Sequence, residues 1–291
     1  MNGSHEITDD KIFSSFIELI KKYRATTFFT ITILFTWFCQ SFSLLDQNNL
    51  LSIHISSTVL FVISKIGGFG PSLAAVMLTL LTEGKKGVIK LVKKIFIWKA
   101  DYYLYLFVLF SFAIIFIVSL RICSLISDEP FVIKSLIRWQ FLLPYFLLNF
   151  FLGGPLGEEL GWRGYALPIL QEKNNALVSS IIIGVIWSLW HLLHFFSPTS
   201  LLSTTPIFLY FIFTSSLSVL FTWVYNNSNG SVLLCMLFHT CNNFFGTVLP
   251  VIPESNGSLI PIYLNTGLVM IVAFVLVFLA GPKNLSKNRS D

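Results

Sequence analysis

Two adjacent glutamates and an arginine lie in one of the most apolar stretches of the chain. Glu158, Glu159 and Arg163 all fall within GGPLGEELGWRGYALPIL, residues 153–170. Each ionisable group at membrane depth costs about 2.5–3.5 kcal/mol on insertion scales, so such a cluster indicates a functional site. On a helix, Glu159 and Arg163 are four residues apart and can pair on one face. Glu158 points about 100° away and can face a cavity.

Two polar clusters downstream could supply partners for these carboxylates. His191 and His194 lie three residues apart in the cluster that begins at Trp187, and His239 and Asn243 lie four residues apart. Each pair falls on one face of an apolar helix, and such faces can converge inside a helical bundle. We expect His194 to have a supporting role, and Trp162, Trp187 and Trp190 to serve mainly in packing.

These residue types fit two chemistries. In the first, Glu158, His191 and His239 bind zinc with an open position for water, although the usual H-E-x-x-H spacing is absent. In the second, no metal is needed. Glu158, assisted by His191, takes a proton from a water that attacks a peptide carbonyl, and His239 and Asn243 donate hydrogen bonds to the oxyanion. Asn242 is an alternative donor to Asn243. The residues themselves leave both chemistries open.

The composition predicts a multi-pass membrane protein. The chain has 291 residues, of which 55% are hydrophobic and 11% charged, and its mean hydropathy is +0.77. A soluble domain carries about 25% charged residues. We therefore predict an all-α bundle of about eight transmembrane helices, each near the roughly 20 residues that a bilayer requires. The predicted segments are 26–45, 57–82, 102–122, 138–156, 176–196, 205–225, 231–249 and 261–280.

The distribution of positive charge predicts the orientation of the chain. Most of the 19 lysines and arginines fall on one side of the predicted segments, and the positive-inside rule places that side and both termini in the cytoplasm. This placement explains the net charge of +5 without nucleic acid as a partner. We expect 1–24 to form a cytoplasmic amphipathic helix that lies on the membrane surface or packs on the bundle.

The second segment contains a lysine and a glycine-rich break. Lys65 precedes Gly67-Gly68-Phe69-Gly70-Pro71, a run that can kink a helix or let backbones approach closely. We expect Lys65 to snorkel or to pair structurally, with a functional charge as the alternative.

The three polar clusters resemble the motifs of the CPBP family, which comprises intramembrane proteases related to type II CAAX prenyl endopeptidases and bacteriocin-processing (Abi) proteins. Its E-E-x-x-x-R corresponds to 158–163, its F-x-x-x-H to 187–191 with Trp187 in place of Phe, and its H-x-x-x-N/D to 239–243. The stretch 69–75 also resembles the second helix of the family. The replacement of Phe by Trp187 is expected to affect the shape of the substrate pocket rather than the chemistry.

The resemblance implies a membrane protease domain at 25–281 and a cytoplasmic tail at 282–291. It implies that Glu158 and His191 activate water, that His239 and Asn243 form the oxyanion hole, and that Arg163 supports both glutamates. We expect a multi-pass protein of the cell membrane, in a bacterial plasma membrane, that acts as a glutamate-type endopeptidase. No cofactor is expected, and zinc is the alternative. The expected partners are the lipid bilayer and a membrane protein or peptide substrate.

Two other functions fit the same residues. A non-enzymatic bacteriocin self-immunity or membrane scaffold protein could bind a peptide in the same cavity. A transporter could use Glu158 and Lys65 for ion coupling, although transporters often carry paired broken helices and this sequence has one such segment.

Overall fold

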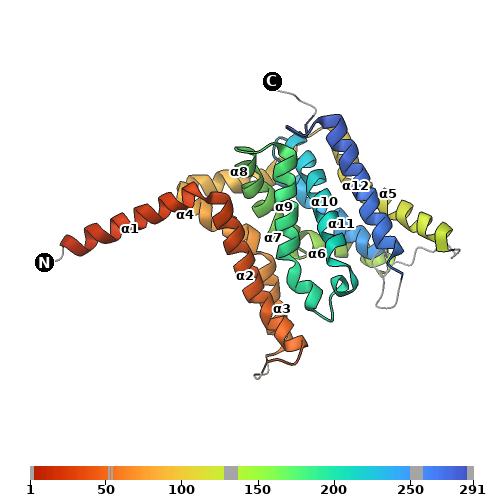
Figure 1. Ribbon diagram of the computed structural model, residues 1–291, viewed down its shortest axis with the longest axis horizontal. Helices are drawn as coiled ribbons and strands as arrows, with labels where there is room; N and C mark the ends of the chain where they lie inside the picture. The colour runs from red at the N-terminus through yellow and green to blue at the C-terminus, as the bar shows by residue number, and fades with distance from the viewer. Residues whose placement is uncertain (1–2, 52, 54, 128–136, 250–257, 287–291) are drawn as a thin grey trace.

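A computed structural model describes residues 3–51, 53, 55–127, 137–249 and 258–286, without the side chains of 3–10, 12 and 13. Throughout these residues the chain forms helices joined by short connections, with no strand, as the all-α prediction requires (Figure 1). The end of the predicted tail, 287–291, lies outside the described residues.

Five helices are long and apolar enough to cross a membrane. They are α2 (Arg24–Gln47), α5 (Tyr102–Ser127), α10 (Ile207–Asn227), α12 (Ile260–Ala280), and α9 (Ala176–Trp190) taken together with the short helix η4 (Leu192–Phe196). A sixth span results if α3 (Ser57–Gly68) and α4 (Gly70–Lys93) are counted as one bent element. Two predicted segments contain shorter helices, α6 (Leu142–Leu152) and α11 (Val232–Val248). The count of eight and the cytoplasmic termini therefore remain predictions.

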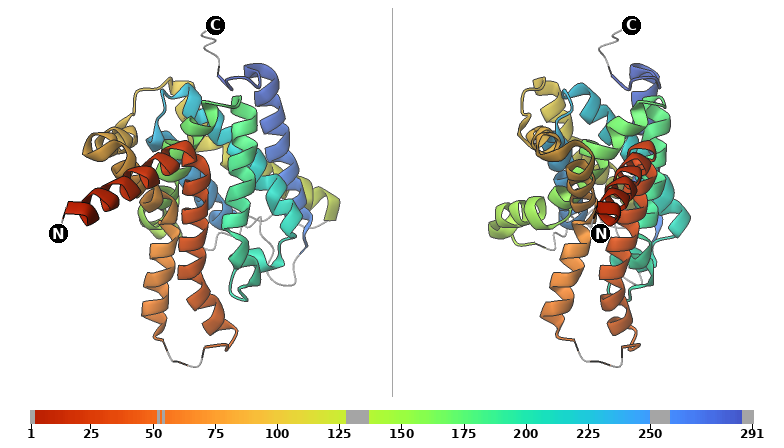
Figure 2. Two further views of the ribbon diagram at one scale, coloured as in Figure 1. Left: turned by 60° about the vertical axis from the view of Figure 1, so that its left-hand side comes forward. Right: turned by 90° about the vertical axis from the view of Figure 1, so that its left-hand side faces the viewer.

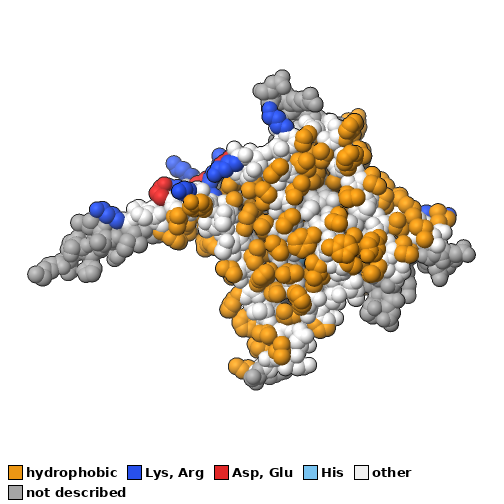
Figure 3. Space-filling view, in the orientation of Figure 1, with side chains coloured by type: hydrophobic (Ala, Val, Ile, Leu, Met, Phe, Trp, Pro, Cys, Tyr) orange, Lys and Arg blue, Asp and Glu red, His pale blue; other side chains and the backbone are white. Residues whose placement is uncertain are grey.

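The outer surface of the bundle is apolar. Large side chains point outward along α12, where Phe274 is 72% exposed and Phe278 is 79% exposed. Figure 3 shows hydrophobic side chains over most of one face, with lysines and arginines gathered at its upper edge. A water-soluble protein does not expose a contiguous apolar surface of this extent. The surface is that of a multi-pass membrane protein.

The predicted break in the second segment positions the glutamate motif. Helices α3 and α4 meet at Phe69 with a bend of 52°. The motif segment packs directly against this bend through Gly157 and Gly161. A Cβ on Gly157 would lie 2.9 Å from the Gly68 carbonyl oxygen, and one on Gly161 would lie 2.5 Å from the Pro71 backbone. Glycines spaced four apart allow this close approach.

Helix α1 (Gly3–Lys22) extends away from the bundle (Figures 1 and 2). Near its end, Ile20 is buried, whereas Phe16 and Leu19 remain exposed. Among its described side chains, the helix therefore contacts the bundle through its last turns. Attachment to the membrane surface remains a prediction.

Candidate active site

The glutamate motif begins on a sharp turn and continues in an unusually wide helix. Gly153 and Gly154 separate α6 from the short helix α7 (Pro155–Glu159), and Gly154 has a φ of +120° that favours glycine. A π-helix, η3 (Leu160–Ala166), follows, and every one of its residues is buried. Helix α8 (Leu167–Gln171) then ends the segment. Single π-turns are frequent at functional sites, and this one contains Arg163.

The Glu158 carboxylate is buried and held at one oxygen. Trp187 on α9 donates a hydrogen bond from Nε1 to Glu158 Oε2 at 2.8 Å. A Cβ on Gly154 would lie 2.5 Å from Glu158 Oε1 and 3.9 Å from Cε1 of His239. The absence of a side chain at Gly154 thus allows the carboxylate to lie against this residue, next to the His239 ring.

Glu159, Arg163 and His239 form a buried ionic centre. Nη1 of Arg163 lies 3.2 Å from Oε1 and 3.1 Å from Oε2 of Glu159, so the predicted pairing of these residues is confirmed, in a π-turn rather than an α-turn. The guanidinium Cζ also lies 4.6 Å from the ring centre of Trp187 and 4.1 Å from that of Phe221. Such stacking suits the weakly hydrated guanidinium.

The same carboxylate orients His239. Nδ1 of His239 lies 2.7 Å from Glu159 Oε1. Because an ionised carboxylate can only accept hydrogen bonds, this nitrogen carries the proton. Nε2 is then left for the site, as an acceptor in the neutral ring or a donor in the imidazolium.

His191 is oriented from the main chain of Trp187. Its Nδ1 lies 3.0 Å from the carbonyl oxygen of Trp187 and must donate to it, which leaves Nε2 with a lone pair. Trp187 therefore contacts Glu158 through its side chain and His191 through its backbone. Nε2 of His194 instead lies 3.3 Å from Nε2 of Gln40 on α2.

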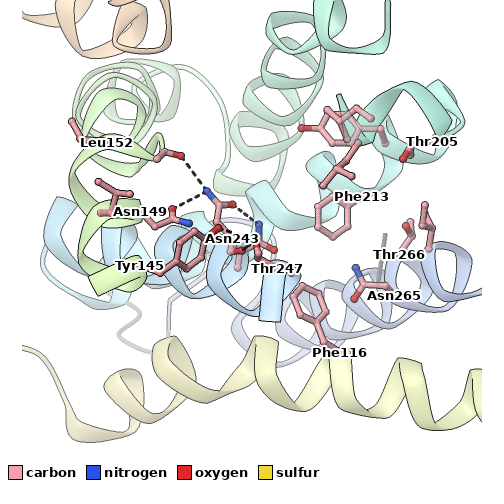
Figure 4. A pocket seen from close by; sticks show the side chains of 18 of the residues that line it. Phe116, Tyr145, Asn149, Leu152, Thr205, Phe213, Asn243, Thr247, Asn265 and Thr266 are labelled. Carbon is pink, nitrogen blue, oxygen red and sulfur yellow. Dashed lines mark hydrogen bonds between the residues drawn. The ribbon is translucent and has the colours of Figure 1, made fainter. Parts of the chain in front are cut away.

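Asn243 belongs to α11, and weak contacts hold its side chain near the end of α6. Its Nδ2 is 3.4 Å from the Gly153 carbonyl oxygen and 3.5 Å from Asn149 Oδ1. Figure 4 marks both contacts of Asn243 with dashed lines. Asn242 donates to Asn243 Oδ1 at 3.2 Å. Both distances from Asn243 Nδ2 are longer than a usual hydrogen bond, so a substrate oxygen could replace these acceptors.

A cavity of about 530 Å³ adjoins this group, between α3, α5, α6, α10, α11 and α12. Most of its lining is apolar, and its polar lining includes Lys65, Tyr145, Asn149, Tyr210, Asn242 and Asn243. Glu158, His191 and His239 are not among the lining residues. The cavity lining nearest to them includes Gly153, Asn243 and Tyr210. The ring centre of Tyr210 lies 5.6 Å from that of His191.

The proposed zinc ligands do not form a metal site as arranged. Within the described part of the chain, no group of three His, Cys, Asp or Glu side chains is placed to hold a metal ion. Glu158 accepts from the Trp187 indole at Oε2, and His239 contacts Glu159 through Nδ1. The zinc mechanism remains the alternative to the glutamate mechanism.

The structure corrects one expectation and adds three residues. Trp187 was expected to serve in packing and to affect only pocket shape, but its indole N–H contacts the candidate base. Asn149, Gly154 and Tyr210 were not predicted. Asn149 is a polar residue within the apolar run LLPYFLLNFFL, and that isolation is a signal that could have identified it. Nothing local in the sequence distinguishes Gly154 from Gly153.

Comparison with known proteins agrees with the motif resemblance. Residues 139–245 match the family described as Type II CAAX prenyl endopeptidase Rce1-like. A protein named CAAX prenyl protease 2, from Methanococcus maripaludis, is 28% identical over 133 residues, which cover 41% of this chain. The match spans 44% of that relative, less than half of its length. Residues 139–245 contain all three polar clusters, so this match agrees with the resemblance of those clusters to the motifs of the CPBP family.

Proposed function

We propose that this protein is an intramembrane endopeptidase that hydrolyses a peptide bond in a membrane-associated protein or peptide. The observation that carries the proposal is the buried Glu158 carboxylate. Oε2 is fixed by Trp187, and Oε1 lies against Gly154 on the side of the His239 ring. A general base must be held within reach of the proton that it removes. The family match supports the same activity.

In the proposed reaction, Glu158 and His191 activate a water molecule. Glu158 takes a proton from the water, and the water oxygen attacks the substrate carbonyl carbon. Nε2 of His191 is free to accept a hydrogen bond from the same water, because Nδ1 is committed to the Trp187 carbonyl. The C–N bond then breaks, and the proton passes from Glu158 to the leaving amine.

His239 and Asn243 are proposed to stabilise the tetrahedral oxyanion. Nδ1 of His239 is held by the Glu159 carboxylate, and in this role Nε2 donates to the oxyanion from the imidazolium form. Asn243 could donate from Nδ2 on exchanging its long contacts for the oxyanion. Removal of one such donor in other hydrolases lowers kcat by about 10²–10³-fold.

The test is cleavage by purified protein in lipid nanodiscs, with a membrane-protein fraction of its source as substrate and new peptide termini detected by mass spectrometry. Glu158→Gln and His239→Ala are expected to lower product formation by at least about 10²-fold. Phe274→Ala, which alters only the outer face of α12, is the matched control. Normal cleavage by Glu158→Gln would contradict the proposal.

A chelator arm separates the glutamate and zinc mechanisms. We expect unchanged cleavage after dialysis against 1,10-phenanthroline, since no three His, Cys, Asp or Glu side chains among the described residues are placed to hold a metal ion. Loss of cleavage that added zinc restores would favour the metal mechanism instead.

A further inference from the structure

Lys65 lies in the wall of the cavity, outside the region that matches the family. It is on α3, and it shares the cavity lining with Asn149 and Asn243. Its Nζ donates a hydrogen bond to the carbonyl oxygen of Leu152 at 3.2 Å, and it lies 5.4 Å from the ring centre of Phe61.

The charge of Lys65 is not neutralised within the described residues. The ion pairs there involve Lys21, Arg24, Arg163 and His239, and none involves Lys65. An ammonium has three donors, and the single hydrogen bond to a neutral carbonyl leaves two of them and the full charge. The neighbouring Phe61, Ile66 and Leu152 are exposed apolar side chains. A cation among such groups is costly unless it finds an anionic partner.

The position of Lys65 connects it with the candidate oxyanion hole. Leu152 and Gly153 are consecutive residues at the end of α6. The Leu152 carbonyl accepts a hydrogen bond from Lys65, and the Gly153 carbonyl accepts one from Asn243. The two donors therefore sit one residue apart along the same backbone. An anion bound by Lys65 would lie close to a carbonyl bound by Asn243.

We propose that Lys65 forms an anion-binding subsite that recognises a carboxylate of the peptide substrate close to the bond to be cleaved. This inference rests on the proposed function, because it names a feature of the substrate of that site. A lipid phosphate is the less favoured anion, since Lys65 shares its cavity with the catalytic donors.

A binding experiment tests the subsite independently of cleavage. The probes are two fluorescent apolar peptides of identical sequence, one ending in a carboxylate and the other in a carboxamide. Affinity is measured by anisotropy with protein in phosphatidylcholine nanodiscs, in the Glu158→Gln background so that no product forms. We expect the carboxylate peptide to bind about tenfold more tightly, as a charge-assisted hydrogen bond predicts.

Two substitutions separate the charge from the hydrogen bond to α6. Lys65→Gln keeps a donor for the Leu152 carbonyl but removes the charge, and is expected to abolish the preference for the carboxylate peptide. Lys65→Arg keeps the charge and is expected to retain the preference. Lys90→Gln is the matched control, because Lys90 is exposed on α4 outside the cavity lining.

Three results would overturn the subsite. The protein that retains Lys65 could bind both peptides equally, or Lys65→Gln could keep the full preference for the carboxylate peptide. Third, the preference could disappear when phosphatidylglycerol replaces part of the phosphatidylcholine. The third would assign the ammonium to a lipid phosphate. Failure of the proposed function would instead appear as normal cleavage by Glu158→Gln, so the two failures are distinguishable.

Discussion

The ionic centre and the cavity wall are two polar regions of the same helical bundle, and they differ in burial and in the length of their contacts. The ionic centre consists of Glu159, Arg163 and His239, with Glu159 and Arg163 fully buried and contacts of 2.7–3.2 Å. The cavity wall, meaning Lys65, Asn149 and Asn243, has contacts of 3.2–3.5 Å and includes an exposed lysine.

The difference separates positioning from recognition. In the ionic centre each charge has an opposite charge beside it and aromatic rings around it, so breaking one contact leaves an uncompensated buried charge. In the cavity wall the donors hold neutral carbonyls loosely and can exchange them for a substrate. We therefore expect substitutions in the ionic centre to lower the free energy of unfolding. Substitutions toward the cavity wall are expected to change kcat or KM.

The largest effect is expected for Glu159→Gln. It removes the counter-charge of Arg163 while keeping the shape, and should lower the free energy of unfolding by about 3–5 kcal/mol. The measurement is denaturant unfolding in detergent micelles. The control is Glu172→Gln, which breaks the partly exposed pair with Arg24 and should cost at most about 1 kcal/mol. Equal losses in both variants would remove the distinction between buried and exposed pairs.

The next effect is expected for Gly154→Ala, at the boundary between the two regions. A methyl group there would lie 2.5 Å from Glu158 Oε1 on a backbone with positive φ. Displacement of the carboxylate should lower kcat by about 10²-fold. Gly267→Ala on α12 is the control, because a Cβ there meets no atom within 4 Å. Full activity of Gly154→Ala would show that catalysis does not depend on the position of the Glu158 carboxylate.

A smaller effect is expected for Trp187→Phe, which introduces the Phe of the F-x-x-x-H motif and removes the hydrogen bond to Glu158. We expect kcat to fall about tenfold with KM unchanged, since one hydrogen bond of this kind is worth about 1–2 kcal/mol. Trp190→Phe is the matched control, because its Nε1 has no hydrogen-bond partner among the described residues. An equal loss in both variants would assign the effect to packing.

The smallest effect is expected for Asn149→Ala in the cavity wall. Its Oδ1 meets Asn243 only at 3.5 Å, so its removal should raise KM about threefold and leave stability nearly unchanged. Asn265→Ala is the control, since Asn265 lines the same cavity without contacting Asn243. A large loss of stability in Asn149→Ala would place this residue with the ionic centre.

Periodicity and spacing could predict the helices and the pairs that lie on single helices. Long apolar runs predict spans because the bilayer requires about 20 such residues, and at four of them the structure forms single helices long and apolar enough to cross a membrane, α2, α5, α10 and α12. Glu159 and Arg163 are four apart, so local geometry alone brings them together. The seventh segment was predicted at 231–249, and α11 covers Val232–Val248.

Contacts between distant helices could not be predicted in the same way. The spacing of His239 and Asn243 favours a shared face, but does not reveal that His239 meets Glu159, 80 residues earlier. The sequence likewise classes Trp187 as an aromatic packing residue. Its role at Glu158 depends on how α9 rotates against α7.

The amino-acid sequence by itself determines that this is a helical membrane protein with three polar clusters in apolar segments, because hydropathy and helical spacing are local properties. Tertiary structure decides which of those groups share a partner. Packing of Gly157 and Gly161 on the α3–α4 bend sets the motif against α9 and α11. Only then does one carboxylate meet Arg163 and His239 while its neighbour meets Trp187, since hydrogen bonds act over about 3 Å.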